Sequence, residues 1–451
     1  MQLNLLPDLI LKEILSHLDK SYRFRLAAVN KGWHSVILPL LIESFDLNFT
    51  SDEDNKIMLK ILKKYGPFIK RLYVKDAMYL EYKEYLTNVK TIHFTLDEYL
   101  INIKEYKEFN VTMMDYKKSI NNLPLEDYTN KNNICFKELF KNITYFRAED
   151  IDDYLFDEII TTLPTTINEF CLISYIGYHN PIIEKILKNR TNLKRLSIYF
   201  DLIEYDLKKL LDKPFNLLVS LNIANQSYCN EEYILNLNNL PQLKELYLYN
   251  NGDMTVKGTS QVTKIRFFAQ NLQYIEISKV TFPKLRILSI SFCQNLNDYK
   301  LYLIFNLPNL TNFELAEDIF CDPKLSLTYN HELKCSNLIS LTITNVSITN
   351  LFLENLITCY PILSILCLAK CVFINEKNLN YNLASNSPLK SSNLTNVSLS
   401  DCKGNIEQAI ELIVSNCPKI QVFNLYPNNE DYLDFNLSDE VKLKLLELND
   451  G

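Results

Sequence analysis

Glycine is scarce in this chain, with 7 residues in 451, and positive charge is not in excess. Loops that cradle phosphate and tight catalytic turns need backbone with positive φ, which glycine supplies most readily, so few glycines argue against enzymes built on such loops. Lys and Arg number 47 against 54 Asp and Glu, for a net charge of -7. Because phosphate-binding surfaces carry clustered basic residues, we do not expect nucleic acid as the main partner.

Long apolar runs are also missing. The longest uncharged apolar run near the N-terminus, Val36 to Ile42, is far shorter than the roughly 20 residues that a membrane helix needs. Asp8, Lys12 and Glu13 interrupt the preceding apolar stretch, which is not typical of a signal peptide. We therefore expect no membrane association and a cytoplasmic and/or nuclear location, where the eleven cysteines would be free thiols.

Catalytic and metal-binding motifs are not found. The five histidines are scattered without metal-type pairing, and the sequence has neither a Gly-x-Ser-x-Gly elbow nor a P-loop. Cys359, Cys367 and Cys371 are close in sequence, but the repeat described below points them in different directions, whereas zinc needs convergent ligands. The expectation is a protein that is not an enzyme and has no catalytic residues, cofactor or metal.

A repeated template, an apolar residue followed by two variable residues, an apolar residue, a variable residue and a third apolar residue, dominates the chain. A clear copy is Leu193-Lys-Arg-Leu196-Ser-Ile198. Further copies begin at Leu218, Leu243, Leu272, Leu285, Leu310, Leu338, Leu363, Leu394 and Ile420, and weaker ones at Ile69, Val89, Ile143 and Ile167. From Ile143 onward most copies follow one another at similar intervals, which indicates stacked supersecondary units.

Each unit combines a strand and, in many copies, a preceding helix. The alternating end of the template has the period of a half-buried strand, and 406–417 is a helix-like stretch before one copy. A proline, which cannot continue a helix, precedes many templates by two residues. These prolines are Pro67, Pro241, Pro283, Pro308, Pro361 and Pro418.

Five copies carry Asn or Cys five residues after the second apolar anchor, where the side chain can turn inward and satisfy backbone groups at the strand's end. These residues are Asn251, Cys293, Cys371, Cys402 and Asn428. With this pattern the chain resembles leucine-rich repeats, particularly the cysteine-containing class, from roughly Ile69 to Asn428. Two places depart from it: Leu272 and Leu285 are too close together for a full strand-helix unit, and between Val89 and Ile143 the pattern degrades, with 111–116 as one eroded copy.

The N-terminal segment, 1–40, breaks the repeat and predicts helices. Pro7 suits a helix's first turn, and an apolar stripe follows at helical spacing. Leu6-Pro7-Asp8-x-Ile10-Leu11-x-x-Ile14-Leu15-Ser16-x-Leu18-Asp19, followed by Arg25-Leu26-x-x-Val29-x-Lys31-x-Trp33, resembles the F-box. Lys20 replaces the family's usual proline after Leu-Asp, and Arg23 stands where leucine is common.

The resemblance implies binding of the adaptor subunit of an SCF-type (cullin-RING) E3 ubiquitin ligase, and through it cullin. The adaptor-binding residues would be Leu6, Pro7, Ile10, Ile14, Leu15, Leu18, Val29 and Trp33. The alternative is that these helices are only the cap that a solenoid requires, in a scaffold or inhibitor unrelated to ubiquitin.

The predicted fold class is α/β: a leucine-rich-repeat solenoid with a parallel strand ladder and convex helices, preceded by a small all-α F-box module. The expected divisions are the F-box helical module at 1–45, a linker helix with degenerate N-terminal repeats at 46–142, the solenoid at 143–428 and an acidic C-terminal cap or tail at 429–451, more typical of a solvated end than of a docking arm.

In leucine-rich repeats the residues that alternate with the strand's core residues line the concave face, so this face is where we expect a protein target. Its middle is rich in tyrosine and charge, the usual composition of binding hot spots, whereas the far half carries mainly small hydroxyl side chains. Because tyrosine is common throughout, with 28 residues, chance clustering remains an alternative. The candidate target-binding residues are Tyr199, Tyr247, Tyr249, Tyr274, Arg195, Glu245 and Glu276.

Overall fold

The computed structural model of this chain describes residues 44–47, 60, 62–74, 85–95, 142–149, 163–173, 192–199, 214–224, 233–252, 254–270, 272, 275–293, 295–317, 322–323, 325–327, 337–374, 393–426 and 435–449. The chain divides into two compact units, Met1–Asp206 and Leu207–Gly451. All the predicted adaptor-binding residues, the eroded copy at 111–116 and Tyr274 lie outside the described residues.

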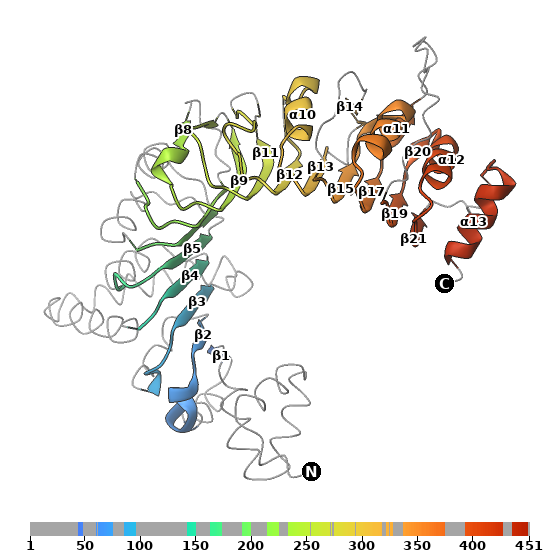
Figure 1. Cartoon of the computed structure of the whole chain (residues 1–451). Helices are drawn as coiled ribbons and strands as arrows, with labels where there is room; N and C mark the ends of the chain where they lie inside the picture. Colours follow the sequence, from blue (N-terminus) through green and yellow to red (C-terminus); the bar gives the residue numbers. More distant parts are fainter. Residues whose placement is uncertain are drawn as a thin grey trace, which may run out of the picture. The chain divides into compact units, whose positions relative to one another are not determined.

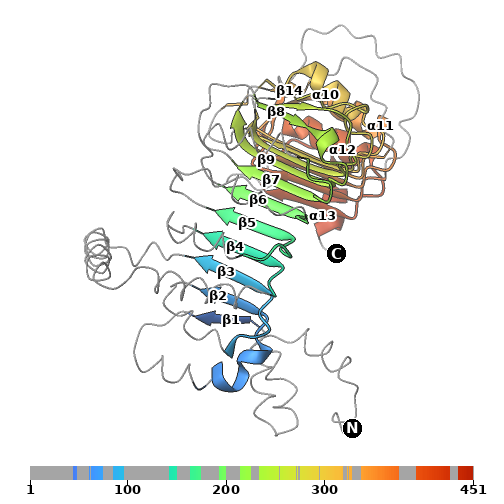
Figure 2. The ribbon, with the colours of Figure 1, turned by 90° about the vertical axis from the view of Figure 1, so that its left-hand side faces the viewer.

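The N-terminal unit contains a parallel strand ladder (Figures 1 and 2). Its described strands are β1 (Ser44–Leu47), β2 (Arg71–Val74), β3 (Thr91–Thr95), β4 (Tyr145–Glu149), β5 (Glu169–Ile173) and β6 (Arg195–Tyr199). Each pairs in parallel with the next along the chain. The weak templates that begin at Ile69, Val89, Ile143 and Ile167 therefore do form ladder strands, and β1 adds a strand that the template did not predict.

One row of equivalent apolar residues runs through the core of this ladder. Leu72, Ile92, Phe146, Phe170 and Leu196 occupy equivalent positions in register and are all buried. The rings of Phe146 and Phe170 are stacked with centroids 5.4 Å apart. Neighbouring strands lie only about 4.8 Å apart, so equivalent side chains meet and exclude water along the ladder.

Glycine is required at one turn of this unit. Gly66 begins the 3-10 helix η2 (Gly66–Phe68), where a Cβ atom would lie 2.2 Å from the backbone oxygen of Tyr85. Any larger side chain would separate the turns before β2 and β3.

The C-terminal unit contains a second stretch of parallel ladder, in the order β7-β9-β11-β12-β13-β15-β17-β19-β21. Its strands are β7 (Ser220–Ala224), β9 (Glu245–Gly252), β11 (Lys264–Gln270), β12 (Ile287–Ser291), β13 (Asn312–Ala316), β15 (Ser340–Thr344), β17 (Ile365–Ala369), β19 (Asn396–Ser400) and β21 (Val422–Tyr426). Leu221 and Leu246 pair in register, as do Leu341 and Leu366, and all four are buried as predicted.

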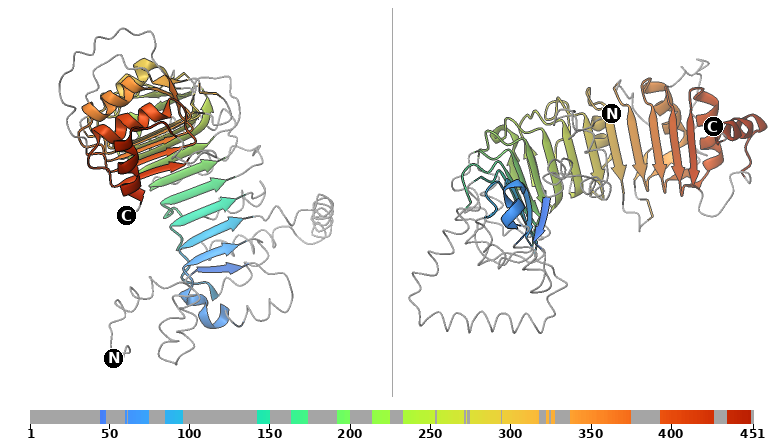
Figure 3. Two further views of the ribbon diagram at one scale, coloured as in Figure 1. Left: turned by 90° about the vertical axis from the view of Figure 1, so that its right-hand side faces the viewer. Right: turned by 90° about the horizontal axis from the view of Figure 1, so that it is seen from below.

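Helices pack on one side of this ladder and cover its apolar side chains (Figures 1 and 3). They are α10 (Asp298–Phe305), α11 (Asn350–Cys359) and α12 (Ile406–Asn416). The Asn297 side chain caps α10 by accepting from the Lys300 backbone N–H at 3.0 Å, and Thr349 caps α11 through Phe352 N–H at 3.2 Å. In α12, Ile406, Ala409, Ile410, Ile413 and Val414 repeat at helical spacing and are buried, so the predicted helix at 406–417 is confirmed.

Short parallel ladders also form on the helix side. One pairs β8 (Tyr233–Asn236) with β10 (Met254–Lys257), and the 3-10 helix η5 (Leu237–Asn239) follows β8. The other contains β14 (Ser326–Leu327), β16 (Ser347–Thr349), β18 (Val372–Ile374) and β20 (Lys403–Gly404). These pairs satisfy backbone groups of segments that follow several of the ladder strands.

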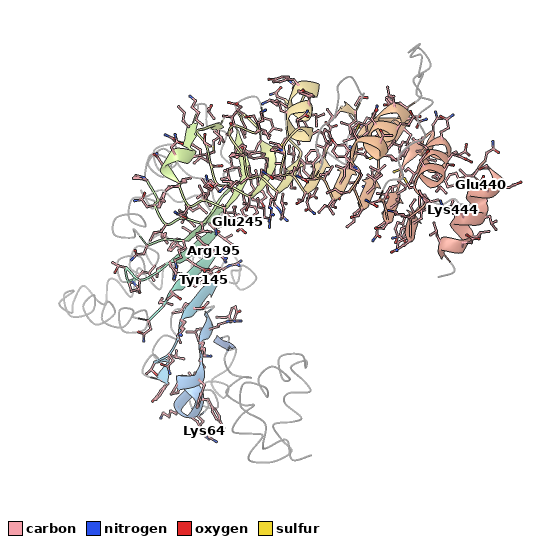
Figure 4. The ribbon with its side chains drawn as sticks, in the orientation of Figure 1. Lys64, Tyr145, Arg195, Glu245, Glu440 and Lys444 are labelled. Atoms are coloured by element: carbon pink, nitrogen blue, oxygen red, sulfur yellow. The ribbon has the colours of Figure 1, made fainter. Side chains whose placement is uncertain are left out.

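The C-terminal end of this unit is covered by α13 (Asp439–Asn449), not left as a solvated tail. Leu437, Val441 and Leu445 are buried, and Lys444 Nζ donates to the Val414 carbonyl at 2.7 Å (Figure 4). Apolar residues at helical spacing cover the last strand and α12, while the acidic side chains on the outer face give the segment its charge.

The segment around Leu272 does not occupy the position that the template predicted. The strand between β9 and β12 is β11, built on Ile265 and Phe267, and Leu272 is buried outside the ladder. Ile275 instead bridges Val256 of β10, on the helix side. The short interval between Leu272 and Leu285 that disturbed the repeat therefore arises because Leu272 does not begin a ladder strand.

Candidate functional site

The candidate site is the strand face of the C-terminal unit, meaning the surface formed by the residues that alternate with the core residues of its ladder strands. In β15 these are Ser340, Thr342 and Thr344, all half-exposed, while Leu341 and Ile343 point into the core. Because successive side chains of a strand point to opposite faces, changes on this face leave the core intact.

Five ladder strands carry a left-handed residue at or just after their end. Ala269, Phe292, Asn345, Lys370 and Asp401 stand four residues after their strand's second anchor, with φ between 51° and 56°. The N–H of Lys370 donates to the Ser400 carbonyl at 2.7 Å, and the N–H of Asp401 to that of Tyr426 at 2.9 Å. Left-handed backbone is unfavourable for residues other than glycine, so these bonds between strands maintain it.

The predicted cysteine position follows directly after this turn. Cys371 Sγ donates to the Ile343 carbonyl at 3.5 Å, and Cys402 Sγ to that of Leu368 at 3.4 Å, each on the preceding strand. These thiols therefore satisfy backbone carbonyls, as predicted. Burial raises the pKa of the Cys293 thiol to about 11, and a hydrogen bond to Cys402 together with burial raises the pKa of Cys371. Raised pKa values keep both sulfurs protonated and poorly nucleophilic at neutral pH.

A row of asparagines, which the sequence did not suggest, connects neighbouring units at the turns before their strands. Asn309, Asn337 and Asn393 each precede a template leucine and donate Nδ2 to the carbonyl of the preceding unit's corner proline. The three distances are 2.8, 2.6 and 2.7 Å. Asn88 donates to Pro67 in the same way in the N-terminal unit. Asparagine therefore joins proline as a marker of the corner.

Aromatic and cationic side chains gather on β9 and β11. Tyr247 and Tyr249 alternate along β9, and their register partners on β11 are Arg266 and Phe268. The Tyr249 and Phe268 ring centroids are 5.9 Å apart, and those of Phe268 and Phe292 are 5.0 Å apart. Lys264 Nζ lies 5.5 Å from the Tyr247 ring centroid and Arg266 Cζ 5.9 Å, within the range of cation–π interactions.

The predicted target-binding residues divide among several places. Glu245, Tyr247 and Tyr249 lie on β9, and Figure 4 shows Glu245 there. Tyr199 and Arg195 lie on β6 of the N-terminal unit, where Arg195 Nη1 is 3.9 Å from Glu169 Oε2 of β5.

Glu276 does not lie on the strand face, so its predicted placement is wrong. It follows Ile275, whose carbonyl accepts from Lys300 Nζ of α10 at 2.9 Å, and its carboxylate accepts from Ser278 Oγ at 3.0 Å. This carboxylate therefore lies on the helix side, near Lys300. Tyr274 lies outside the described residues. Its predicted place beside β9 required Leu272 to begin the next ladder strand, and β11 occupies that position instead.

Sequence reasoning missed Lys264, Arg266 and Phe268, although Val262-x-x-Ile265-x-Phe267 fits the template. The corner proline is replaced there by Ser260, whose hydroxyl contacts the Val262 N–H and the Thr281 carbonyl at 3.4 Å each. The copy that begins at Val262 lacks the corner proline, and the nearby copy that begins at Leu272 has the leucine typical of the template. The sequence therefore gave no reason to prefer the copy at Val262.

The strand face of the C-terminal unit exposes aromatic and cationic groups. Within the described residues, no group of three or more His, Cys, Asp or Glu side chains could hold a metal ion. Among the same residues, no helix combines the length and apolar character that crossing a membrane requires. Exposed rings, a guanidinium and an ammonium group offer contact area and charge to a partner.

Comparison with known proteins identifies the start of the chain, ahead of the described strands. No curated protein matches the sequence. Residues 3–42 match the family model of the F-box domain, a span that contains every residue predicted to bind an adaptor.

Proposed function

We propose that this chain is the substrate-recognition subunit of an SCF-type ubiquitin ligase. Its F-box would bind the adaptor subunit and through it cullin, and its units, which we interpret as leucine-rich repeats of the cysteine-containing class, would bind a protein target. In this role the chain performs no catalysis itself. The observation that carries the proposal is the F-box match at residues 3–42, placed ahead of parallel strand ladders.

The repeat interpretation is supported by features that recur from unit to unit. Buried leucines in register, cysteines that satisfy strand-end carbonyls and corner prolines recur down the ladder of the C-terminal unit. Such units depend mainly on their neighbours for stability. Their outward residues are free to specialise, which suits a receptor that must recognise one particular target.

The test is affinity purification of the tagged full-length chain, with adaptor and cullin as the readout. We expect both subunits in stoichiometric amounts with the chain. Replacing Leu6 and Pro7 together by Ala should abolish their recovery, because each buried aliphatic anchor contributes about 1.5–3 kcal/mol to such a surface. The matched control, Thr342→Ala with Thr344→Ala, changes two outward residues far along the sequence and should recover both subunits normally.

Circular dichroism melts should show that the variant with Leu6 and Pro7 replaced by Ala is folded, since the repeats do not need these two side chains. Unchanged recovery of adaptor and cullin by the folded variant would contradict the proposal. Absence of both from the unmodified chain would favour a scaffold or inhibitor in which the N-terminal segment is only a cap.

A further inference from the structure

The aromatic patch, defined as Tyr247, Tyr249, Phe268 and Phe292, extends over β9, β11 and the start of the turn after β12. Tyr249, Phe268 and Phe292 form a continuous row of neighbouring rings. The Phe268 side chain is 37% exposed, although it is a large apolar group. Contiguous exposed rings are costly in water and mark interaction surfaces more often than isolated ones do.

Two cations accompany the patch. Lys264 and Arg266 both lie over the Tyr247 ring, and neither forms an ion pair with any described residue. The register partners of Arg266 are Tyr247 and Ser289, which are uncharged. The guanidinium is exposed and positioned by the ring beneath it. A planar guanidinium in this state is well suited to bind a carboxylate with two hydrogen bonds.

The outward residues of the later strands differ in charge from those of β11. From β13 to β19 the outward residues are small or neutral, apart from Glu314. Glu314 is two strands from Arg266, at about twice the 4.8 Å strand spacing. On β11, Glu245 of β9 stands opposite Lys264, whereas no acidic residue stands opposite Arg266, so the unmatched positive charge of this patch is that of Arg266.

The spacing along β11 defines the ligand further. Arg266 and Phe268 are two residues apart on one strand, so their side chains leave the sheet about 7 Å apart. An extended peptide presents alternate side chains at the same interval. A carboxylate and an apolar side chain two residues apart can therefore meet Arg266 and the rings at the same time.

We propose that β9, β11 and the start of the turn after β12 bind an acidic peptide segment, in which a Glu or Asp lies two residues from an aromatic or large aliphatic side chain. The inference rests on the proposed function, since the segment would belong to the target of the receptor.

The experiment uses the purified full-length chain and fluorescein-labelled nine-residue peptide pools. One pool fixes Glu-x-Phe at its centre, a second replaces Glu by Gln, and a third replaces Phe by Ala, with Gly, Ser and Ala elsewhere. Fluorescence anisotropy should show the Glu-x-Phe pool binding at least about 10-fold more tightly than both others, a difference typical of one hot-spot contact. Salt should weaken this binding, because the charge pair is exposed to solvent.

Variants on β11 make the test sharper. Arg266→Glu should remove the preference for Glu over Gln and produce a preference for a pool that fixes Lys-x-Phe. Phe268→Ala should remove the preference for Phe over Ala. The matched control Thr342→Ala, on the same face but outside the patch, should bind all pools as the unmodified chain does.

Equal binding of the Glu and Gln pools, or unchanged selectivity in folded Arg266→Glu, would overturn the inference. Binding that requires phosphoserine in place of Glu would also overturn it. Adaptor recovery should be normal in the Arg266→Glu and Phe268→Ala variants, because these residues lie far in sequence from residues 3–42. Failure of the peptide prediction with normal adaptor recovery would overturn this inference alone, and loss of adaptor binding by the unmodified chain would overturn the proposed function.

Discussion

Two stretches of the ladder in the C-terminal unit bury apolar residues in the same way but expose different residues on the strand face. Between β9 and β12, the outward residues and the turn that follows include Tyr247, Arg266, Phe268 and Phe292, whereas β15 presents Ser340, Thr342 and Thr344. Both stretches bury their alternate residues and pair in parallel with their neighbours. The backbone and the core are therefore independent of the outward residues, and recognition can vary along the face without loss of the fold.

The largest expected effect tests whether interior and exterior are separable on one strand. Leu341 is completely buried, so Leu341→Asp places an unpaired charge in the core and should cost about 4 kcal/mol or more. Thr342→Asp, on the outward side of the same strand, should cost about 0.5 kcal/mol or less. Urea denaturation followed by circular dichroism measures both, and similar losses at the two sites would show that the register of β15 is assigned incorrectly.

The next prediction compares the two exteriors directly, once a target is in hand. Tyr247→Ala with Tyr249→Ala should weaken target binding about 10- to 100-fold, because aromatic rings supply large contact area at a small loss of rotamer freedom. Thr342→Ala with Thr344→Ala should change it little, since water already satisfies those hydroxyls. Calorimetric titration gives both affinities. A larger loss from the threonine pair would place the recognition surface on β15.

A smaller effect concerns the asparagine row that both stretches share. Asn309→Ala removes the hydrogen bond to the Pro283 carbonyl and should cost about 1 kcal/mol of folding free energy. Asn424→Ala, at an exposed position of β21, is the matched control and should be nearly neutral. The denaturation midpoints of the two variants would reveal whether the row stabilises the corners; equal midpoints would mean that it does not.

The smallest predicted effect is a gain. Lys370 holds φ at 53°, where a Cβ atom is unfavourable, so Lys370→Gly should raise stability by about 0.5 kcal/mol. Thr344→Gly, in the regular part of β15, should instead lower it by about 0.5–1 kcal/mol. Loss of stability in Lys370→Gly would indicate that the lysine side chain contributes more than its backbone strain costs.

Periodicity alone was enough to predict most of the ladder. Apolar anchors at a regular interval, such as Leu341 and Leu366, must be buried together because no single unit can cover its apolar face alone. The inward cysteines were predictable for a related reason, since a strand that ends in the interior leaves carbonyls that need a donor. That the N-terminal segment 1–40 is helical stays a prediction, and the F-box family model matches residues 3–42, which include most of this segment and the two residues beyond it.

Which of two similar templates forms the strand after β9 depends on pairing between distant parts of the chain. Val262-x-x-Ile265-x-Phe267 and Leu272-x-x-Ile275-x-Ile277 have the same pattern, and local periodicity cannot separate them. The first pairs with both β9 and β12, while the second supplies Ile275 to a bridge with Val256. This pairing determines which side chains lie beside Tyr247. It brings Lys264, Arg266 and Phe268 to the strand face and places Glu276 near α10. The physical reason is that the outward residues of a strand are determined only when its neighbouring strands are determined.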